Sequence, residues 1–432
     1  MKKIFPHIVL LFSLVANAQE NMHPSPAQTE TIALINGVIH VGNGQTIENG
    51  MIIFSGGKII DVRPTEAIMD VKVIDLKGKQ VYPGIIEANS NLGLVEIDAV
   101  HSTEDLEELG DFNPSIRSLV AYNTDSKIIN TVRSNGILLA NIVPDGGIIS
   151  GSSSVVQLDA WSWEDAAYNK DNGIHFRMPS LFFTPPQLRP PGPVPETDRI
   201  KQNLDKIESV RKFFREARAY NNETAHIATN LKFAAVKGLF DQSKTFFVHC
   251  ELVNEMMIAI DMAKEFNFRL VLVGASDSWL MTDMIKQNNV AVILEEPHAL
   301  PNTEYDDVSQ PYKTGAALQQ AGILFTIYQD NEMSITRQRN IPFEAGTMAA
   351  YGLTKEQALS TITLNAAKIL GIDNITGSLE KGKDANIVVS EGDLLDMRTS
   401  KVTLAFIQGR EINLDNKQTQ LFEKYKYKYG IK

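Results

Sequence analysis

The fold is decided by residues 245–275, which read TFFVHCELVNEMMIAIDMAKEFNFRLVLVGA. A short run of aromatic and β-branched residues opens this stretch, a helical run over 251–266 follows, and a second apolar run at 269–275 closes it. Two more apolar runs come later, at 290–296 and 323–330. Apolar strands that alternate with helices at intervals of about 20–35 residues predict βαβ units and a parallel sheet.

Short β-rich runs lie on both sides of this α/β region. Residues 30–80 contain several, separated by the turn sequences GNGQ, SGGK and KGKQ. After the last helical segment, ANIVVSEGD and VTLAFIQGREI return to the strand pattern. Neither group can bury a face by itself, so we expect the two terminal segments to pair beside a barrel. Between the two β-rich parts, residues 198–220 carry apolar side chains on one helical face and predict a further helix.

A proline-rich stretch interrupts the chain before this helix. Residues 185–195 contain six prolines, which exclude a helix or a central strand. The stretch is either a surface linker or a stiff loop over the mouth of the barrel.

Composition and charge limit the classes of function. The chain has 432 residues, of which 43% are hydrophobic and 22% charged, as in a globular protein with one large and one smaller domain. A net charge of −11 without Lys/Arg runs argues against a nucleic-acid surface. The single cysteine, Cys250, excludes internal disulfides. Because it follows His249 on a strand, we expect its side chain to be buried on the opposite face.

The N-terminal residues resemble a targeting segment. Lys2 and Lys3 precede an apolar run, and the run ends in the small-residue sequence Ala16-Asn17-Ala18. This pattern predicts a secretory signal over residues 1–18, with a retained anchor as the alternative. Neither this run nor a later one reaches the roughly 18 apolar residues of a membrane span. We therefore expect export to the periplasm or the extracellular space.

Several stretches resemble the amidohydrolase superfamily, near its imidazolonepropionase-like branch. The opening strands match its first segment, and VYPGIIEANSNLGL at 81–94 resembles its first barrel strand. Residues 248–276 resemble its fifth and sixth barrel strands. The most specific match is GLTKEQALSTITLNAAKILGIDNITGSLEKGKDANIVV at 352–389, which resembles its last helix and return strand. Residues 110–166 resemble a subgroup of exported bacterial members.

The resemblance implies a fold and a division of the chain. We expect a (β/α)₈ TIM-like barrel over residues 81–372, beside a small β-sandwich. Residues 30–80 and 373–412 would form the two halves of that sandwich, and residues 413–432 would be a tail.

The resemblance also implies a metal site. The family holds one or two divalent metals, zinc among them, where barrel strands end, and an aspartate there moves the proton. In this chain the ligand positions of strands one, five, six and eight fall on Asn89 and Asn91, His249, Gly274 and Asp330. His249 and Asp330 remain as metal ligands, with Asp330 also catalytic. Because zinc usually has about three protein ligands, we predict a degenerate site without a tightly held metal.

Other side chains could rebuild the site, or could be structural. Lys232 and Lys237 are candidates for a strand-four ligand, with surface helix positions as the alternative. The remaining candidates, each also readable as a loop or core residue, are Glu87, His101, Glu295, Glu296 and His298.

Two functions follow from these observations, and a third, a metal-independent enzyme with Asp330 or Glu87 as its base, has no independent sign in the sequence. The first is a hydrolase of carbon–nitrogen bonds, cyclic amides included, with an altered metal site. The second is a catalytically inactive binding or partner subunit that keeps the barrel. An amide-type small molecule, a second copy of the chain or a related amidohydrolase subunit are the expected partners.

Overall fold

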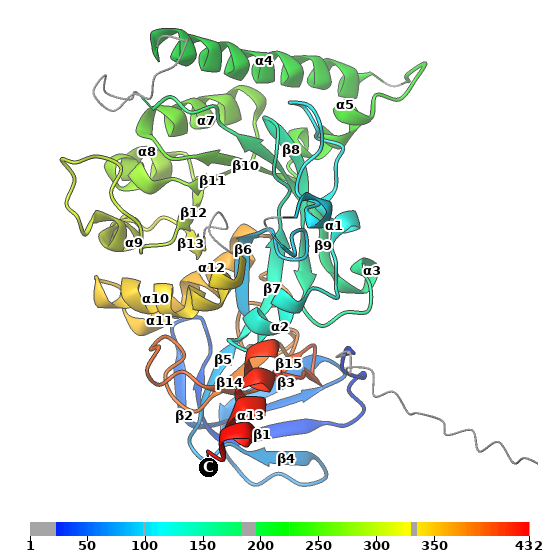
Figure 1. Cartoon of the computed structure of the whole chain (residues 1–432), viewed down its shortest axis with the longest axis vertical. Helices are drawn as coiled ribbons and strands as arrows, with labels where there is room; N and C mark the ends of the chain where they lie inside the picture. The colour runs from blue at the N-terminus through cyan, green and yellow to red at the C-terminus, as the bar shows by residue number, and fades with distance from the viewer. Residues whose placement is uncertain (1–22, 98–99, 183–195, 224, 330–334, 432) are drawn as a thin grey trace, which may run out of the picture.

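The structure is a computed structural model that describes residues 23–97, 100–182, 196–223, 225–329 and 335–431. Its described strands form two eight-stranded sheets. In Figure 1 the sheet built from both ends of the chain lies at the bottom, and the barrel strands with their helices lie above it. The proline-rich stretch lies outside the described residues.

The upper sheet is a nearly closed barrel. Its strands follow the chain in order from β6 to β13, and β13 comes back to lie against β6. Most of these strands are buried along their whole length, which explains their continuous apolar sequences. The strands are β6 (Ile85–Ser90), β7 (Ile137–Ile142), β8 (Ile149–Gln157), β9 (Ala167–Arg177), β10 (Thr245–Cys250), β11 (Leu270–Gly274), β12 (Ala291–Glu295) and β13 (Phe325–Tyr328).

One barrel strand departs from the expected all-parallel arrangement. β8 runs antiparallel to both β7 and β9, whereas β9 to β13 are parallel to one another. Residues 143–148 join β7 to β8, and so short a connection allows only an antiparallel turn. The TIM-like architecture is therefore confirmed, with one reversed strand.

Helices cover the outside of the barrel. α4 (Glu196–Asn222) was predicted over 198–220, and it buries Ile207, Val210 and Phe214 against the strands. α7 (Val253–Phe266) buries Met256 and Ile260 in the same way. The other helices are α1 (Ser118–Ala121), α2 (Lys127–Arg133), α3 (Trp163–Ala166), α5 (Leu231–Ala235), α6 (Lys237–Phe240), α8 (Thr282–Gln287), α9 (Gln310–Ala321), α10 (Ile341–Ala350), α11 (Lys355–Thr361), α12 (Leu364–Ile369) and α13 (Lys417–Tyr429), with 3₁₀ turns η1 (His101–Thr103), η3 (Ser276–Met281) and η4 (Ile335–Asn340). None of the helices among the described residues is both long and apolar enough to cross a membrane.

The lower sheet joins the two ends of the chain. β14 from the C-terminal part pairs with β5 from the N-terminal part, and Val388 lies opposite Tyr82. The N-terminal strands are β1 (Ile32–His40), β2 (Thr46–Ser55), β3 (Lys58–Pro64), β4 (Lys72–Asp75) and β5 (Gln80–Pro83), and the C-terminal strands are β14 (Ile387–Ser390), β15 (Val402–Ile407) and β16 (Arg410–Glu411). The two terminal segments thus form one β unit, while a division of that unit into a sandwich stays a prediction.

The energetic coupling between the N-terminal and C-terminal strands of this β unit can be measured at one buried aromatic pair. Phe54 on β2 and Phe406 on β15 are fully buried, and their rings meet edge to face at 5.1 Å. We expect the changes Phe54→Leu and Phe406→Leu to couple by about 0.5–1.5 kcal/mol, the usual value for an aromatic pair. Urea unfolding of both single variants and the double variant gives this coupling. Phe406→Leu combined with the distant Phe214→Leu is the control and should be additive.

Candidate active site

A cavity of about 460 Å³ lies where the barrel strands end. Its walls come from the ends of β6, β9, β10, β11, β12 and β13 and from the loops that follow β6 and β7. In barrels of this kind the catalytic groups lie at this end of the strands. Its lining residues are Asn89, Asn91, Val95, Glu104, Leu106, Asp145, Arg177, His249, Glu251, Val273, Glu295, Tyr328 and Ile335.

Two amides, Asn89 on β6 and Asn91 just after it, line this cavity at the positions where the resemblance implies two histidines. Glu87, Asn89 and Asn91 alternate along the chain and so share one face of the strand. Glu87 is fully buried, and its Oε1 accepts a hydrogen bond of 3.2 Å from the Asn89 backbone N–H. Burial raises the pKa of Glu87 well above its usual value, because a buried carboxyl favours its neutral form.

His249 is bonded to a second histidine that sequence reasoning missed. His175 Nδ1 on β9 lies 2.9 Å from His249 Nε2 on β10. Burial lowers the pKa of both imidazoles well below the usual value, so they form a neutral pair in which one ring donates to the other. His175 also stacks on Phe247, with ring centroids 4.7 Å apart. The sequence Ile174-His175-Phe176 could have revealed this histidine, because a polar residue between two apolar ones is typical of a strand that turns one side chain into the barrel.

Glu251 occupies the space beside Gly274, the position where the resemblance implies a strand-six histidine. A Cβ added at Gly274 would overlap the Glu251 carboxylate. Ser276 holds this carboxylate through its hydroxyl, at 2.6 Å, and through its backbone N–H, at 3.1 Å. Gly274 also has φ of +86°, which disfavours any side chain. Burial raises the pKa of Glu251 to about 7, and the two hydrogen bonds from Ser276 partly oppose that rise.

Glu255, in the first turn of α7, holds the loop that carries Glu251. The Oε2 of Glu255 accepts hydrogen bonds from the backbone N–H groups of Glu251, at 3.0 Å, and Leu252, at 3.2 Å. Its Oε1 accepts one of 2.7 Å from Leu181. Because Glu255 is itself buried, it anchors the loop at the start of α7 and so fixes where Glu251 points.

The described lining of the cavity is rich in carboxylates and includes one arginine. Arg177 at the end of β9 pairs with Asp145, with Nε 2.7 Å from Oδ1. Glu104, Glu251 and Glu295 line other parts of the wall. This charge distribution favours a neutral or positively charged small molecule over an anion.

Of the side chains proposed to rebuild a metal site, Glu295 lines the cavity and the others lie elsewhere. Glu296 pairs with Arg337 of η4 at 2.8 Å. His298 contacts α10, with Nδ1 3.1 Å from Glu344 and Nε2 2.9 Å from Thr347. His101 is largely exposed, 3.4 Å from Glu104.

The structure also locates the remaining candidates. Lys232 in α5 and Lys237 in α6 are exposed helix residues outside the cavity lining. Cys250 is buried as expected, with its thiol 3.7 Å from the Val248 carbonyl oxygen. Asp330 lies outside the described residues, and its catalytic and metal-binding roles stay predictions.

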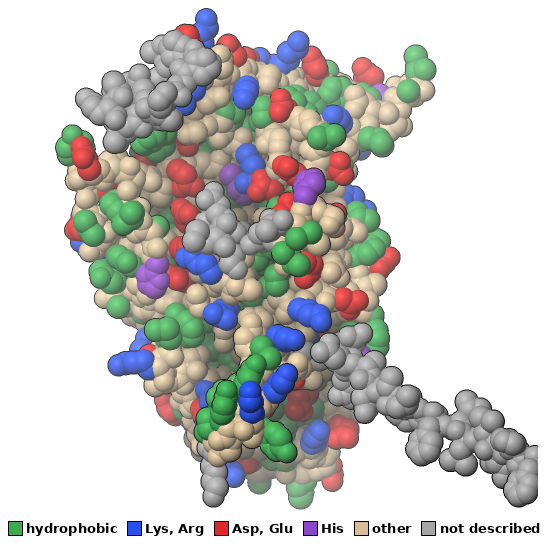
Figure 2. All heavy atoms as spheres, in the orientation of Figure 1, with side chains coloured by type: hydrophobic (Ala, Val, Ile, Leu, Met, Phe, Trp, Pro, Cys, Tyr) green, Lys and Arg blue, Asp and Glu red, His purple; other side chains and the backbone are tan. Residues whose placement is uncertain are grey.

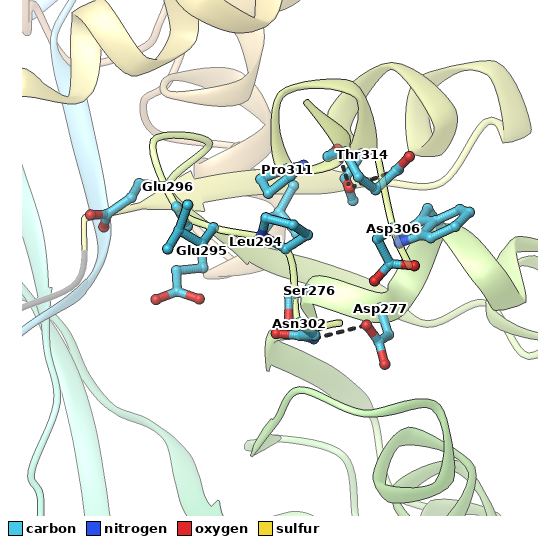
Figure 3. Close-up of a pocket in the computed structure, with 14 residues that line it drawn as sticks. Ser276, Asp277, Leu294, Glu295, Glu296, Asn302, Asp306, Pro311 and Thr314 are labelled. Carbon is cyan, nitrogen blue, oxygen red and sulfur yellow. Dashed lines mark hydrogen bonds between the residues drawn. The ribbon is translucent and has the colours of Figure 1, made fainter. Parts of the chain in front are cut away.

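A smaller hollow lies beside the mouth of the barrel. Figure 3 shows Asn302 donating to Asp277, at 2.8 Å, while Glu295 and Glu296 point to other sides from the end of β12. The hollow has a volume of about 40 Å³. That is room for very few water molecules, so the larger cavity is the candidate active site.

The described residues do not fit a zinc site. His249 Nε2 is engaged by His175, Asn89 and Asn91 offer neutral amides, and the side chain beside Gly274 is a carboxyl with a raised pKa. Zinc prefers histidine, cysteine or ionised carboxylate ligands, commonly three in catalytic sites. Within the described ranges no three His, Cys, Asp or Glu side chains are grouped to hold a metal.

Known proteins resemble this chain in sequence. Residues 200–414 match the model of the amidohydrolase family. An imidazolonepropionase from Flavobacterium psychrophilum is 32% identical over 96 residues, which are 22% of this chain and 23% of that protein. An adenine deaminase from Desulforamulus reducens is 24% identical over 89% of this chain and 57% of its own length. The chain thus spans less than two thirds of these relatives.

Solved structures share the fold. An amidohydrolase from Thermotoga maritima has a TM-score of 0.76 at 22% identity, over 88% of this chain and 99% of its own. An adenosine deaminase from Xanthomonas campestris with bound zinc has a TM-score of 0.53 at 14% identity, over 93% and 98% of the two chains. The match over residues 200–414 assigns this region of the chain to the amidohydrolase family, and the solved structures show that the chain shares their fold.

Proposed function

We propose that this protein hydrolyses a carbon–nitrogen bond in a small amide-type compound, cyclic amides included, and that Glu251 is the general base. The observation that carries the proposal is a carboxyl group with a pKa of about 7 that lines the barrel cavity at the family's strand-six ligand position. A base with a pKa near the working pH gives the best balance between its ionised fraction and its basicity.

The reaction needs one water molecule and no further reactant. Glu251 takes a proton from water as the oxygen attacks the carbonyl carbon, and the carbon–nitrogen bond then breaks. Glu251 returns the proton to the leaving nitrogen, which gives a carboxylic acid and an amine. The Ser276 hydrogen bonds and the Glu255-anchored loop hold the carboxylate in one orientation throughout.

The relatives support the type of bond. The names amidohydrolase and adenine deaminase denote hydrolysis at carbon–nitrogen bonds, and they belong to proteins similar to most of this chain. Zinc, which the family commonly uses, would supply a bound hydroxide, but the described donor set gives no reason to route the reaction through it.

A second candidate function is ligand or partner binding without turnover. The engagement of His249 by His175 favours it, because the one family histidine that remains is turned into a structural pair. In that case a small amide, a second copy of the chain or a related amidohydrolase subunit would occupy or cover the cavity. We also propose that the protein is exported and acts in the periplasm or outside the cell, which N-terminal sequencing of the mature chain tests.

Metal dependence distinguishes these functions. We expect the mature protein, dialysed against a chelator and checked by elemental analysis, to hydrolyse at least one member of a panel of cyclic amides, dipeptides and adenine. Added zinc should change the rate less than about twofold, because Glu251 and not a metal ion would activate the attacking water. Activity that needs about one equivalent of zinc and is lost in His249→Ala would restore the metal mechanism. Saturable binding of a panel compound without turnover would favour the binding protein.

A further inference from the structure

The C-terminal helix α13 stands on the outside of the molecule. It lies in front of the lower sheet, beside α2, in Figure 1. Asn416 caps its start by accepting from the backbone N–H groups of residues 418 and 419, and donates to Ser134 at 3.0 Å. Gln418 accepts a hydrogen bond of 3.1 Å from Thr131. The helix is therefore fixed to the body at its first turn.

The rest of α13 is exposed although several of its side chains are apolar. Phe422 is 64% exposed, Tyr425 47% and Tyr429 65%. No residue of α13 is buried. Short helices are marginally stable in water, and most helices in proteins gain their stability by packing an apolar face. An exposed aromatic helix of this length indicates a surface that it packs against.

The apolar side chains form one stripe. At 3.6 residues per turn, Leu421, Phe422, Tyr425 and Tyr429 fall within an arc of about 100°. The rings of Tyr425 and Tyr429 are stacked, with centroids 6.3 Å apart. Tyr427 points to the opposite side of the helix, where it is 91% exposed.

Lysines flank this stripe on both sides. Lys417, Lys424 and Lys428 lie along one edge by the same helical geometry, and Lys426 lies along the other. Lys428 Nζ lies 5.8 Å from the centre of the Tyr425 ring and 5.4 Å from that of Tyr429. Figure 2 shows hydrophobic and basic side chains gathered at the place of α13.

Charge is segregated between this helix and the rest of the chain. Four lysines against one glutamate give α13 a net charge of +3, whereas the whole chain has −11. An anionic surface would thus attract this helix and repel most of the remaining protein, which fixes how the molecule would approach it.

We propose that α13 docks the protein on the surface of a membrane that contains anionic phospholipids. An in-plane membrane helix needs an apolar stripe, with lysines at its edges whose stems lie along the apolar layer while the ammonium groups reach the headgroups. Tyrosine suits this depth because its ring is apolar and its hydroxyl polar. The positive charge gathered on this helix in a chain of net charge −11 favours an anionic surface over an apolar groove on another protein.

The test uses the full mature chain and two matched variants. Vesicles of phosphatidylglycerol and phosphatidylethanolamine should sediment the protein at low salt, and phosphatidylcholine vesicles should sediment at least about tenfold less. Phe422→Gln should lower the bound fraction about tenfold, because it removes a largely exposed and wholly apolar ring from the stripe. Tyr427→Gln, an equal loss of aromatic surface on the opposite side, should leave binding within about twofold.

Folding of the variants and the charge dependence of binding are the controls. Thermal unfolding of both variants should match the parent, since neither side chain is buried. Lys424→Gln with Lys428→Gln should weaken binding to the anionic vesicles and leave the small phosphatidylcholine signal unchanged. Absence of vesicle binding at low salt, or equal loss in Phe422→Gln and Tyr427→Gln, would overturn the proposal. So would a dimer in solution that Phe422→Gln dissociates, because the stripe would then be a contact between two copies.

Discussion

Replacing Glu251 by glutamine is expected to lower kcat/KM for amide hydrolysis by about 10²–10⁴-fold, the usual contribution of a general base. Glutamine keeps the size of the side chain and a carbonyl oxygen for the Ser276 hydroxyl, but it cannot take a proton. The loss should appear mainly in kcat, because substrate binding is little altered. In the unchanged protein the rate should rise with pH through about 7, as Glu251 loses its proton.

The same variant should be more stable than the parent at alkaline pH. Burial raises the pKa of Glu251 from 4.5 to about 7, so between these values the folded state holds a proton that the unfolded chain has lost. The folding free energy contributed by this group is therefore lost as pH rises through that window. At pH 8, Glu251→Gln should gain about 1–3 kcal/mol in urea unfolding, and at pH 4 the two proteins should be equal.

Glu344→Gln is the matched control. Burial raises the pKa of Glu344 to about 8, but its side chain faces His298 and lies outside the cavity. We expect this variant to gain stability at high pH in the same way and to keep its activity. Loss of activity in both variants, or unchanged activity in Glu251→Gln, would remove Glu251 from the mechanism.

The barrel could be predicted from the sequence because its strands are buried on both faces. The runs that become β10 to β13 are continuous, apolar and separated by helices, so their short length and this alternation identified them. The reversed strand β8 was not predicted. Its sequence, ISGSSSVVQ, is buried in full but rich in serine, and such residues resemble a loop when read alone.

The sequence predicted which family ligands are missing from the site, but it did not predict which side chains take their place. Asn89, Asn91 and Gly274 are visible as lost ligands when the chain is set beside the family pattern. What fills the vacated space depends on side chains that are distant in sequence: Glu251 beside Gly274, and His175 against His249. Residue spacing does not encode these contacts, because the barrel brings neighbouring strands together through long connections.

The second large effect concerns Gly274. We expect Gly274→Ala to destabilise the protein by about 3–5 kcal/mol, because strained and overpacked buried positions give the largest single-residue costs. The new Cβ would overlap the Glu251 carboxylate, and φ of +86° would strain any residue other than glycine. Urea unfolding measures the cost. Gly382→Ala is the control, since its φ of +89° imposes the same strain but a Cβ there meets no atom.

The two causes can be separated by removing the carboxylate. In a Glu251→Ala background the overlap disappears and the backbone strain remains. Gly274→Ala should then cost only about 1–2 kcal/mol, the cost expected for Gly382→Ala.

The Glu251 carboxylate should also prevent the family's metal ligands from being rebuilt. Asn89→His, Asn91→His and Gly274→His together should fail to bind zinc while Glu251 is present, because the new imidazole has no room. Adding Glu251→Ala should recover measurable zinc binding in a titration, because it clears the space beside residue 274. An equal cost of Gly274→Ala with and without Glu251, or zinc binding by the triple variant alone, would show that Glu251 does not fill the place of the missing ligand.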